Sequence, residues 1–280
     1  MEYIKLNNGV DMPILGLGTF QSTDPQVCEK SIIEAIQNGY RLIDTAQAYG
    51  NEEAVGAAIK NCKIDRKELF ITTKVWFRNY ETEACRASLE ESMCKLGVDY
   101  LDMVLLHWPF GNVYAAWRVL EDFYQAGKVR AIGVSNMDPD RVIDLIIFNK
   151  IKPALNQIEA HLYCQRQSDC QWMKKYGLAV QAYAPLGQGR AKQMFSEAEV
   201  QNLAAKYSKT PAQILLRFLT QLSVSVIPKS VHTERIKENI NIFDFTLSEE
   251  EMLKLIALDT NKPMIGRAQD PELVEFAMTW

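Results

Sequence analysis

Residues 69–106 read LFITTKVWFRNYETEACRASLEESMCKLGVDYLDMVLL, and this stretch shows the pattern that decides the fold. An apolar run at 69–73 is followed by a longer segment of mixed polarity, and Gly97 then precedes a second apolar run at 101–106. A glycine just after a helical pattern is typical of a helix C-terminus. The stretch therefore predicts a strand, a helix and a second strand, as in a parallel sheet.

The same alternation extends over almost the whole chain. Eight apolar runs are separated by amphipathic segments, at 14–17, 40–43, 69–73, 101–106, 129–134, 154–158, 178–182 and 224–227. Eight parallel strands with helices between them close into an α/β (β/α)8 TIM barrel. Residues 3–6 and 10–12 flank an Asn7-Asn8-Gly9 turn, so we expect an N-terminal β-hairpin that closes the barrel bottom. No linker divides the chain, and residues 1–280 are expected to form a single domain.

Hydroxyl residues mark three expected helix starts. Three pairs have the spacing of a capping box, namely Ser196 with Glu199, Thr210 with Gln213 and Ser248 with Glu251.

A doubly wound sheet would also alternate strands and helices, but it predicts a glycine-rich dinucleotide fingerprint after an early strand. The segment 16–20, GLGTF, lacks the third glycine of that fingerprint, and we interpret it as a tight turn at a strand end.

Composition restricts the class of protein. The 280 residues are 48% hydrophobic and 24% charged, which is typical of a globular protein with a sizeable core. A formal net charge of −4 argues against a nucleic-acid partner or an anionic membrane surface. No apolar run approaches the roughly 18 residues that a membrane span needs, and residues 1–5 lack a signal-peptide pattern. We expect a cytoplasmic protein.

The six cysteines and three histidines show no metal-binding pattern. No C-x-x-C pair occurs, and His107, His161 and His232 lie far apart in the sequence. Without a secretion signal, the cysteines are expected to be reduced thiols. We expect no bound metal.

Three consecutive predicted strands end in ionisable residues. They are Asp44, Lys74 and His107, at intervals of 30 and 33 residues, each about one strand and helix unit. The C-terminal ends of barrel strands meet at one mouth, so these side chains are expected to converge there. Tyr49 lies five residues beyond Asp44, in the loop over the same mouth.

These four residue types fit proton transfer to a carbonyl oxygen. A tyrosine has an ordinary pKa of about 10, so it acts as an acid near neutral pH only if its phenolate is stabilised. An ammonium from Lys74 would stabilise the phenolate, and Asp44 would keep that ammonium charged. A neutral His107 would orient the carbonyl. Each residue alone has a structural explanation, such as a helix cap or a solvated rim, so the prediction depends on all four together.

A second cluster follows the eighth apolar run. Lys229, Ser230, Val231 and His232 precede a predicted helix that contains Arg235, Glu238 and Asn239. Helix N-termini and the loops after the last barrel strands commonly bind phosphate. Two cations and a hydroxyl around an adenosine 2′-phosphate would favour NADPH over NADH. The alternative is a basic rim on an exposed helix.

Over essentially its whole length the chain resembles the aldo-keto reductase superfamily. The matching motifs are GYRLIDTAQAYGNE at 39–52, ITTKVW at 71–76, LLHWP at 105–109, GKVRAIGVSN at 127–136 and IPKS at 227–230. The pattern is most similar to the small prokaryotic-type members that reduce diketogluconates, glyoxal, methylglyoxal and other small carbonyls. The resemblance implies a monomeric NADPH-dependent reductase with a small-molecule carbonyl substrate.

The resemblance also implies a role for individual residues. The catalytic tetrad would be Asp44, Tyr49, Lys74 and His107, with hydride passing from NADPH to the carbonyl carbon and Tyr49 protonating the oxygen. Ser135, Asn136 and Gln157 would hold the nicotinamide carboxamide, Tyr183 would stack on its ring, and Ala184 and Leu186 would pass near the pyrophosphate. Gly18, Thr19 and Asp44 complete the predicted cofactor site. Phe20, Trp76 and Trp108 would line the substrate pocket with Tyr49 and His107.

Two other functions are compatible with a barrel of this kind. The first is a nucleotide-binding regulatory or scaffold protein with little turnover, which the complete tetrad disfavours. The second is an aldolase or another Schiff-base enzyme that uses Lys74 as its nucleophile.

Overall fold

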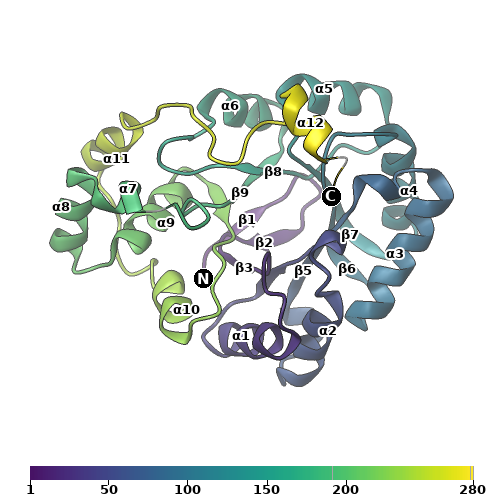
Figure 1. Cartoon of the computed structure of the whole chain (residues 1–280), viewed down its shortest axis with the longest axis horizontal. Coiled ribbons are helices and arrows are strands. Elements are labelled where there is room, and N and C mark those ends of the chain that lie inside the picture. The colour runs from purple at the N-terminus through teal and green to yellow at the C-terminus, as the bar shows by residue number, and fades with distance from the viewer. Residues whose placement is uncertain (191, 278, 280) are drawn as a thin grey trace.

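Eight parallel strands form one sheet that curves into a barrel (Figure 1). In the computed structural model, which describes residues 1–190, 192–277 and 279, the strands are β3 (Gly16–Gly18), β4 (Leu42–Asp44), β5 (Phe70–Val75), β6 (Leu101–Leu106), β7 (Val129–Ser135), β8 (Leu155–Glu159), β9 (Ala179–Tyr183) and β10 (Val224–Val226). They are paired in chain order. Parallel bridges from Leu15 to Val226 and from Gly18 to Lys229 join the first strand to the last. The predicted (β/α)8 barrel is confirmed.

Helices cover the outside of the barrel (Figure 1). They are α1 (Pro25–Gln37), α2 (Glu52–Asn61), α3 (Thr82–Leu96), α4 (Val113–Gln125), α5 (Pro139–Phe148), α6 (Gln167–Tyr176), α7 (Lys192–Ser196), α8 (Ala198–Tyr207), α9 (Pro211–Gln221), α10 (Thr233–Ile240), α11 (Glu249–Ile256) and α12 (Pro271–Ala277), with 3₁₀ turns η1 (Gln47–Tyr49), η2 (Arg66–Glu68) and η3 (Phe77–Asn79). None of the helices in the described ranges is long and apolar enough to cross a membrane.

Two of the three predicted capping boxes are present. Thr210 caps α9 and Ser248 caps α11, each with the reciprocal side-chain bond of the box. The prediction at Ser196 is wrong, because Ser196 is the last residue of α7 and Glu197 is the N-cap of α8. The hydroxyl of Ser196 donates instead to the carbonyl oxygen of Lys192, one turn back.

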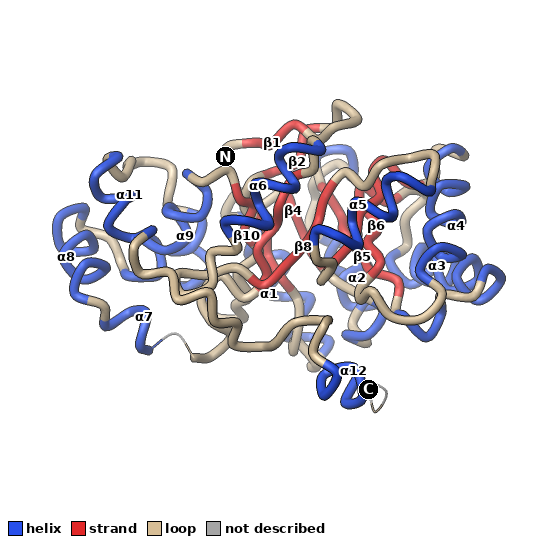
Figure 2. Tube along the Cα trace, turned by 90° about the horizontal axis from the view of Figure 1, so that it is seen from above, coloured by secondary structure: helices blue, strands red, loops and turns tan. Residues whose placement is uncertain are grey.

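The N-terminal hairpin closes one end of the barrel, as predicted. Strands β1 (Tyr3–Lys5) and β2 (Asp11–Pro13) pair antiparallel, and Figure 2 shows them at the end opposite α12. Leu6 and Met12 are buried against apolar side chains of the barrel interior. The Asn7 Nδ2 donates to the carbonyl oxygen of Pro153 at 2.8 Å, which ties the turn to the barrel. The hairpin therefore leaves only the opposite end of the barrel open to a ligand.

Inside the barrel, alternate residues of each strand point inward. The layer next to the hairpin is apolar and includes Leu42, Phe70 and Leu155. Two residues further along β4 and β8 the inward positions are polar, and they are Asp44 and Gln157. The strands thus carry a polar layer at their C-terminal ends, above an apolar base.

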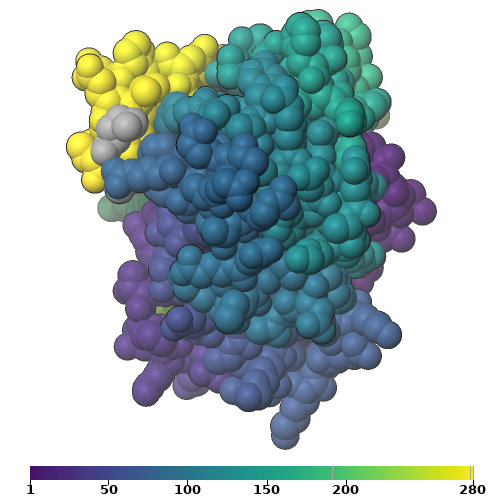
Figure 3. All heavy atoms as spheres, turned by 90° about the vertical axis from the view of Figure 1, so that its right-hand side faces the viewer, coloured from purple at the N-terminus to yellow at the C-terminus, as the bar shows by residue number. Residues whose placement is uncertain are grey.

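The segment after α11 runs past the end of β8 before it reaches α12 (Figure 1). The Glu159 carboxylate, at the end of β8, accepts hydrogen bonds from the backbone N–H groups of Met264 and Ile265. Figure 3 shows the C-terminal part of the chain in yellow, projecting at one corner of the molecule. The end of β8 therefore positions part of the C-terminal segment.

Candidate active site

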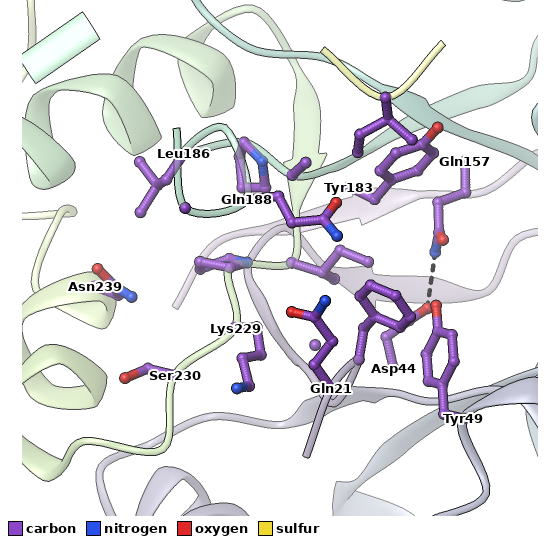
Figure 4. Close-up of a pocket in the computed structure, with 18 of the residues that line it drawn as sticks. Gln21, Asp44, Tyr49, Gln157, Tyr183, Leu186, Gln188, Lys229, Ser230 and Asn239 are labelled. Atoms are coloured by element: carbon purple, nitrogen blue, oxygen red, sulfur yellow. Dashed lines mark hydrogen bonds between the residues drawn. The ribbon is translucent and has the colours of Figure 1, made fainter. Parts of the chain in front are cut away.

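A cavity of about 1070 Å³ lies at the C-terminal ends of the strands. Figure 4 shows Asp44, Tyr49, Gln157 and Tyr183 toward one side of it. Lys229, Ser230 and Asn239 lie toward the other side, with Gln21 and Gln188 in between (Figure 4). The cavity thus extends from the polar layer of the barrel to the start of α10.

Asp44, Lys74 and Tyr49 form one hydrogen-bonded group at the base of this cavity. The Lys74 Nζ lies 2.5 Å from Asp44 Oδ1, 3.0 Å from the carbonyl oxygen of Thr45 and 3.3 Å from the Tyr49 hydroxyl. Lys74 is fully buried, whereas Tyr49 and Asp44 line the cavity. Parallel pairing of β4 with β5 brings the first two residues together, and η1 carries Tyr49 over them. The predicted convergence of these residues is therefore observed.

Burial and charge act in opposite directions on this group. Burial raises the pKa of Tyr49 above its ordinary value, and the Lys74 ammonium offsets part of the rise. Burial alone would lower the pKa of Lys74, but the adjacent Asp44 and Tyr49 oxygens raise it. Burial also raises the pKa of Asp44, against the effects of Lys74 and Gln157. The Lys74 charge lowers the pKa of Tyr49, as expected, but burial raises this pKa by more. The Tyr49 hydroxyl therefore keeps its proton at neutral pH.

His107 follows β6 directly and faces Tyr49 across the cavity. The two rings meet edge to face, with centroids 5.6 Å apart, and Trp76 packs on the other side at 5.2 Å. Burial, reinforced by the Lys74 charge, lowers the pKa of His107 well below 6.5. Its buried Nδ1 has no hydrogen-bond partner among the described residues. The imidazole is therefore neutral at physiological pH, as expected, and one ring nitrogen carries a hydrogen.

Aromatic side chains form the walls on this side of the cavity. Phe20 packs against Tyr49 with centroids 5.0 Å apart, and Trp108 stacks on Phe110 at 5.4 Å. Phe20, Trp76 and Trp108 all line the cavity. The group around Lys74 thus opens into a space walled by aromatic side chains.

Ser135, Asn136, Gln157 and Tyr183 cluster on the opposite wall. The Asn136 Nδ2 donates to the His107 carbonyl oxygen at 3.0 Å, and its Oδ1 accepts from the Tyr183 hydroxyl at 2.7 Å. The Ser135 hydroxyl donates to the Gln157 carbonyl oxygen at 2.9 Å. These contacts hold a planar Tyr183 ring beside two side-chain amides, above the strand ends.

The far end of the cavity carries positive charge. Lys229 and Arg235 are exposed there, and neither forms an ion pair with a residue in the described ranges. The Ser230 hydroxyl accepts from the backbone N–H of His232 at the start of α10. One acidic residue, Glu238, also lines this end. Two free cations beside a helix N-terminus suit a phosphate group.

The chain is similar to known proteins in sequence and in structure. The model of the Aldo/keto reductase family matches residues 14–259. The chain is 43% identical over 262 residues to the glyoxal reductase of Bacillus subtilis, covering 93% of this chain and 94% of the relative. It is 40% identical to the methylglyoxal reductase of Escherichia coli, covering 92% and 94%. The chain belongs to the aldo-keto reductase family.

Solved structures of aldo-keto reductases share the fold. One from a deep-sea metagenome library superposes with a TM-score of 0.94 at 40% identity, covering 95% of this chain and 98% of that one. Another, from Bombyx mori, was crystallised in complex with NADP and superposes with a TM-score of 0.89 at 33% identity, covering 98% and 96%. Family membership makes this chain an oxidoreductase.

The cavity brings together nearly all of the predicted site residues of this aldo-keto reductase. Those that line it are Gly18, Phe20, Asp44, Tyr49, Trp76, His107, Trp108, Ser135, Asn136, Gln157, Tyr183, Ala184, Leu186, Lys229, Ser230, Val231, His232, Arg235, Glu238 and Asn239. Lys74 does not line the cavity, but its ammonium donates a hydrogen bond to the Tyr49 hydroxyl, which does. Thr19 does not line it, because its buried hydroxyl donates to the Asp44 carbonyl oxygen. A direct cofactor contact by Thr19 stays a prediction.

Several lining residues had no signal in the sequence. Phe195 comes from α7, Pro211 and Ala212 from the start of α9, and Ile265 from the C-terminal segment. The capping box at Thr210 indicates a helix start but not its position beside the cavity. Gln21 was missed as well, although it follows Phe20 directly.

Proposed function

We propose that this aldo-keto reductase reduces small aldehydes and ketones to alcohols with NADPH. The observation that carries the proposal is the buried Asp44–Lys74 pair, whose ammonium lies 3.3 Å from a tyrosine hydroxyl in an aromatic-walled cavity. We also propose that the enzyme acts as a monomer in the cytoplasm and that residues 1–280 form a single domain. In its favour, one chain supplies every wall of the described cavity.

The donor set along the cavity fits a dinucleotide phosphate. Tyr183 offers a ring face and Gln157 an amide near Tyr49, which suit a nicotinamide and its carboxamide. Lys229, Ser230 and Arg235 at the other end suit the adenosine 2′-phosphate that distinguishes NADPH from NADH. When bound, the cofactor supplies the hydride.

The protein's own residues position and protonate the substrate. A carbonyl oxygen placed between Tyr49 and His107 would accept hydrogen bonds from the phenol and from the neutral imidazole. As negative charge develops on that oxygen, the Tyr49 proton moves to it. Lys74 stabilises the resulting phenolate, and Asp44 keeps Lys74 charged and aimed at the tyrosine oxygen. Phe20, Trp76 and Trp108 would hold the rest of the substrate without specific polar contacts.

The named relatives support a small dicarbonyl as substrate. Glyoxal and methylglyoxal are the substrates named for two enzymes that are 43% and 40% identical to this chain. We propose that this enzyme accepts the same class of compounds. An aromatic pocket without a dedicated charge partner also favours a range of other small aldehydes.

A Schiff-base function for Lys74 is disfavoured by the geometry. A nucleophilic lysine must lose its proton and reach the substrate. Lys74 is fully buried under Tyr49, and its pKa is raised by the adjacent Asp44 and Tyr49 oxygens despite the opposite effect of burial. Borohydride trapping that leaves no adduct on Lys74 would agree with this reading.

The first experiment is a spectrophotometric assay of NADPH oxidation with glyoxal, methylglyoxal, small aldehydes and keto-sugars. We expect turnover with at least the dicarbonyls and much slower turnover with NADH. Tight NADPH binding without turnover on any carbonyl would contradict the proposal and favour a binding or scaffold role. Gel filtration of the same sample tests the monomer.

A further inference from the structure

Gln47, at the start of η1, ties the turn that carries Tyr49 to the strand that carries Lys74. Gln47 precedes Tyr49 by two residues, and Trp76 follows Lys74 by two residues. The Gln47 Oε1 accepts from the backbone N–H of Trp76 at 2.9 Å and from Asn79 Nδ2, in η3, at 3.2 Å. The Gln47–Trp76 bond therefore links the same two segments as the bond of 3.3 Å between Lys74 and the Tyr49 hydroxyl.

The NH₂ group of the same amide reaches a further element. The Gln47 Nε2 donates to the Ser88 carbonyl oxygen and to Ser92 Oγ, each at 3.1 Å, and both residues belong to α3. The Ser92 hydroxyl donates in turn to the buried Glu52 carboxylate at 3.2 Å. Both lone pairs of Oε1 and both hydrogens of Nε2 are therefore used, which fixes the orientation of the amide.

The turn has anchors at its two ends but few between them. Ala46 is fully buried before it, and the Asn51 side chain bonds the Thr45 hydroxyl at 2.8 Å after it. In the part of the chain that the structure describes, the backbone hydrogen bonds of residues 47–50 are internal to the turn. The hydrogen bonds that hold the middle of the turn against β5 and α3 thus come from side chains, and four of them belong to Gln47.

The contacts of Tyr49 itself hold its hydroxyl only weakly. Phe20, which packs on the tyrosine ring, is 42% exposed. The bond from Lys74 to the hydroxyl is the longest of the three that the Lys74 Nζ forms. A displacement of about 1 Å in a reacting group can cost about 10²-fold in rate. Movement of the turn relative to β5 should therefore be visible in the rate of the chemical step.

We infer that Gln47 is a positioning residue that keeps the Tyr49 hydroxyl aligned with the Lys74 ammonium. Gln47 is not among the described residues that line the cavity, so it contacts neither substrate nor cofactor in this arrangement. It acts on the reaction through Tyr49. The inference rests on the proposed role of Tyr49 as the acid and adds what holds that acid in place.

Gln47→Met keeps the length of the side chain and removes all four hydrogen bonds. We expect the single-turnover rate of methylglyoxal reduction, measured by stopped flow, to fall about 10- to 100-fold. The Kd for NADPH and the KM for methylglyoxal should stay within about 3-fold, because a misplaced acid slows the chemical step without weakening binding. Gln37→Met makes the same change at an exposed position at the end of α1 and should leave the rate unchanged. An unchanged rate in folded Gln47→Met overturns the inference.

A double variant tests whether Gln47 acts through Tyr49. In a Tyr49→Phe background there is no hydroxyl to align, so the further change Gln47→Met should slow the residual reaction by less than about 2-fold. Losses that multiply in the double variant overturn the inference, because they would show a general effect on the fold. Gln47→Ala removes the same bonds with a smaller side chain and repeats both measurements if Gln47→Met does not fold.

Failure of the inference is distinguishable from failure of the proposed function. An unmodified enzyme without turnover, or a Tyr49→Phe variant with full turnover, would refute the proposed function and the inference together. A Tyr49→Phe variant that loses turnover, beside a Gln47→Met variant that keeps it, would refute only the role of Gln47.

Discussion

At the scale of single residues, Tyr49 has an environment unlike that of a core tyrosine. Its hydroxyl faces a cavity, yet a buried ammonium lies 3.3 Å away. Because burial raises its pKa, the phenol stays protonated until a substrate oxygen takes the proton. The Lys74 charge then becomes important, since it lowers the cost of the phenolate that remains.

Tyr49→Phe tests the proposed acid. The ring and its packing on Phe20 remain, but the transferable proton is gone. We expect kcat to fall by about 10²- to 10⁴-fold, the usual contribution of a general acid, while the NADPH Kd changes by less than about 3-fold. Stopped-flow reduction and fluorescence titration measure the two quantities. Unchanged turnover would show that another group supplies the proton.

The neutrality of His107 predicts a dependence of stability on pH. The folded protein keeps this imidazole unprotonated below pH 6.5, whereas the unfolded chain takes up a proton there. Stability should therefore fall as the pH drops below about 6.5, by about 1.4 kcal/mol per pH unit from this group. Urea unfolding at pH 7.5 and 5.5 measures the effect, and His107→Asn should lack this part of the loss. Parallel losses in both proteins would place His107 in a different charge state.

At the scale of elements, the loop after β10 and helix α10 form an end of the cavity separate from the end that holds Tyr49. Lys229 and Arg235 point a pair of cations at the cavity without internal ion pairs in the described part of the chain. On the same helix, Lys237 is bonded to Glu234. Lys237 thus has an ion-pair partner within α10, whereas Arg235, two residues earlier on the same helix, forms no ion pair with a residue in the described ranges.

Arg235→Ala is expected to weaken NADPH by about 10- to 100-fold and NADH by less than about 2-fold, because only NADPH carries the 2′-phosphate. Lys237→Ala on the same helix is the matched control and should leave both affinities unchanged. Fluorescence titration of both variants with NADPH and with NADH measures the four Kd values. An equal loss for both cofactors would place the 2′-phosphate elsewhere.

A buried carboxylate holds part of the C-terminal segment. Glu159 accepts from the backbone of Met264 and Ile265, and its Oε1 also lies 3.0 Å from the His161 Nε2. Glu159→Gln replaces one acceptor oxygen with a donor that faces backbone N–H groups. We expect hydrogen exchange in peptides covering 259–267 to become about 10-fold faster, the effect of losing one charge-assisted hydrogen bond. Glu272→Gln, on exposed α12, is the control, and equal exchange in both variants would contradict the role of Glu159.

At the scale of the whole molecule, the two ends of the barrel have separate tasks. The hairpin end is sealed by apolar packing, and the opposite end carries the polar layer and the cavity. This division is general among barrel enzymes, where the bottom contributes stability and the top carries the chemistry.

Met12→Ala tests that division. Met12 is fully buried between the hairpin and the barrel interior, so its truncation should lower the free energy of unfolding by about 2–5 kcal/mol. The kcat/KM for methylglyoxal should stay within about 2-fold at temperatures where the variant is folded. Tyr3→Ala, at an exposed hairpin position, should cost little stability. A large loss of activity in folded Met12→Ala would show that the two ends are coupled.

The sequence by itself determined the barrel and the centre of its site. The eight apolar runs each correspond to a strand, because buried parallel strands need continuous apolar stretches. Asp44, Lys74 and His107 were predicted to converge because each lies at the same end of consecutive strands. The Thr210 capping box was predictable because its two partners lie only three residues apart in the sequence.

Only the tertiary structure decided what depends on distant partners. The Gln157 amide donates to Asp44, 113 positions earlier, and to Gln181 on the neighbouring strand, and no local pattern reveals these bonds. Ile265 lines the cavity, and its own backbone N–H is bonded to Glu159, more than 100 residues earlier. The balance of burial and charge at Tyr49 was also decided there, since desolvation depends on how the whole barrel packs around the hydroxyl.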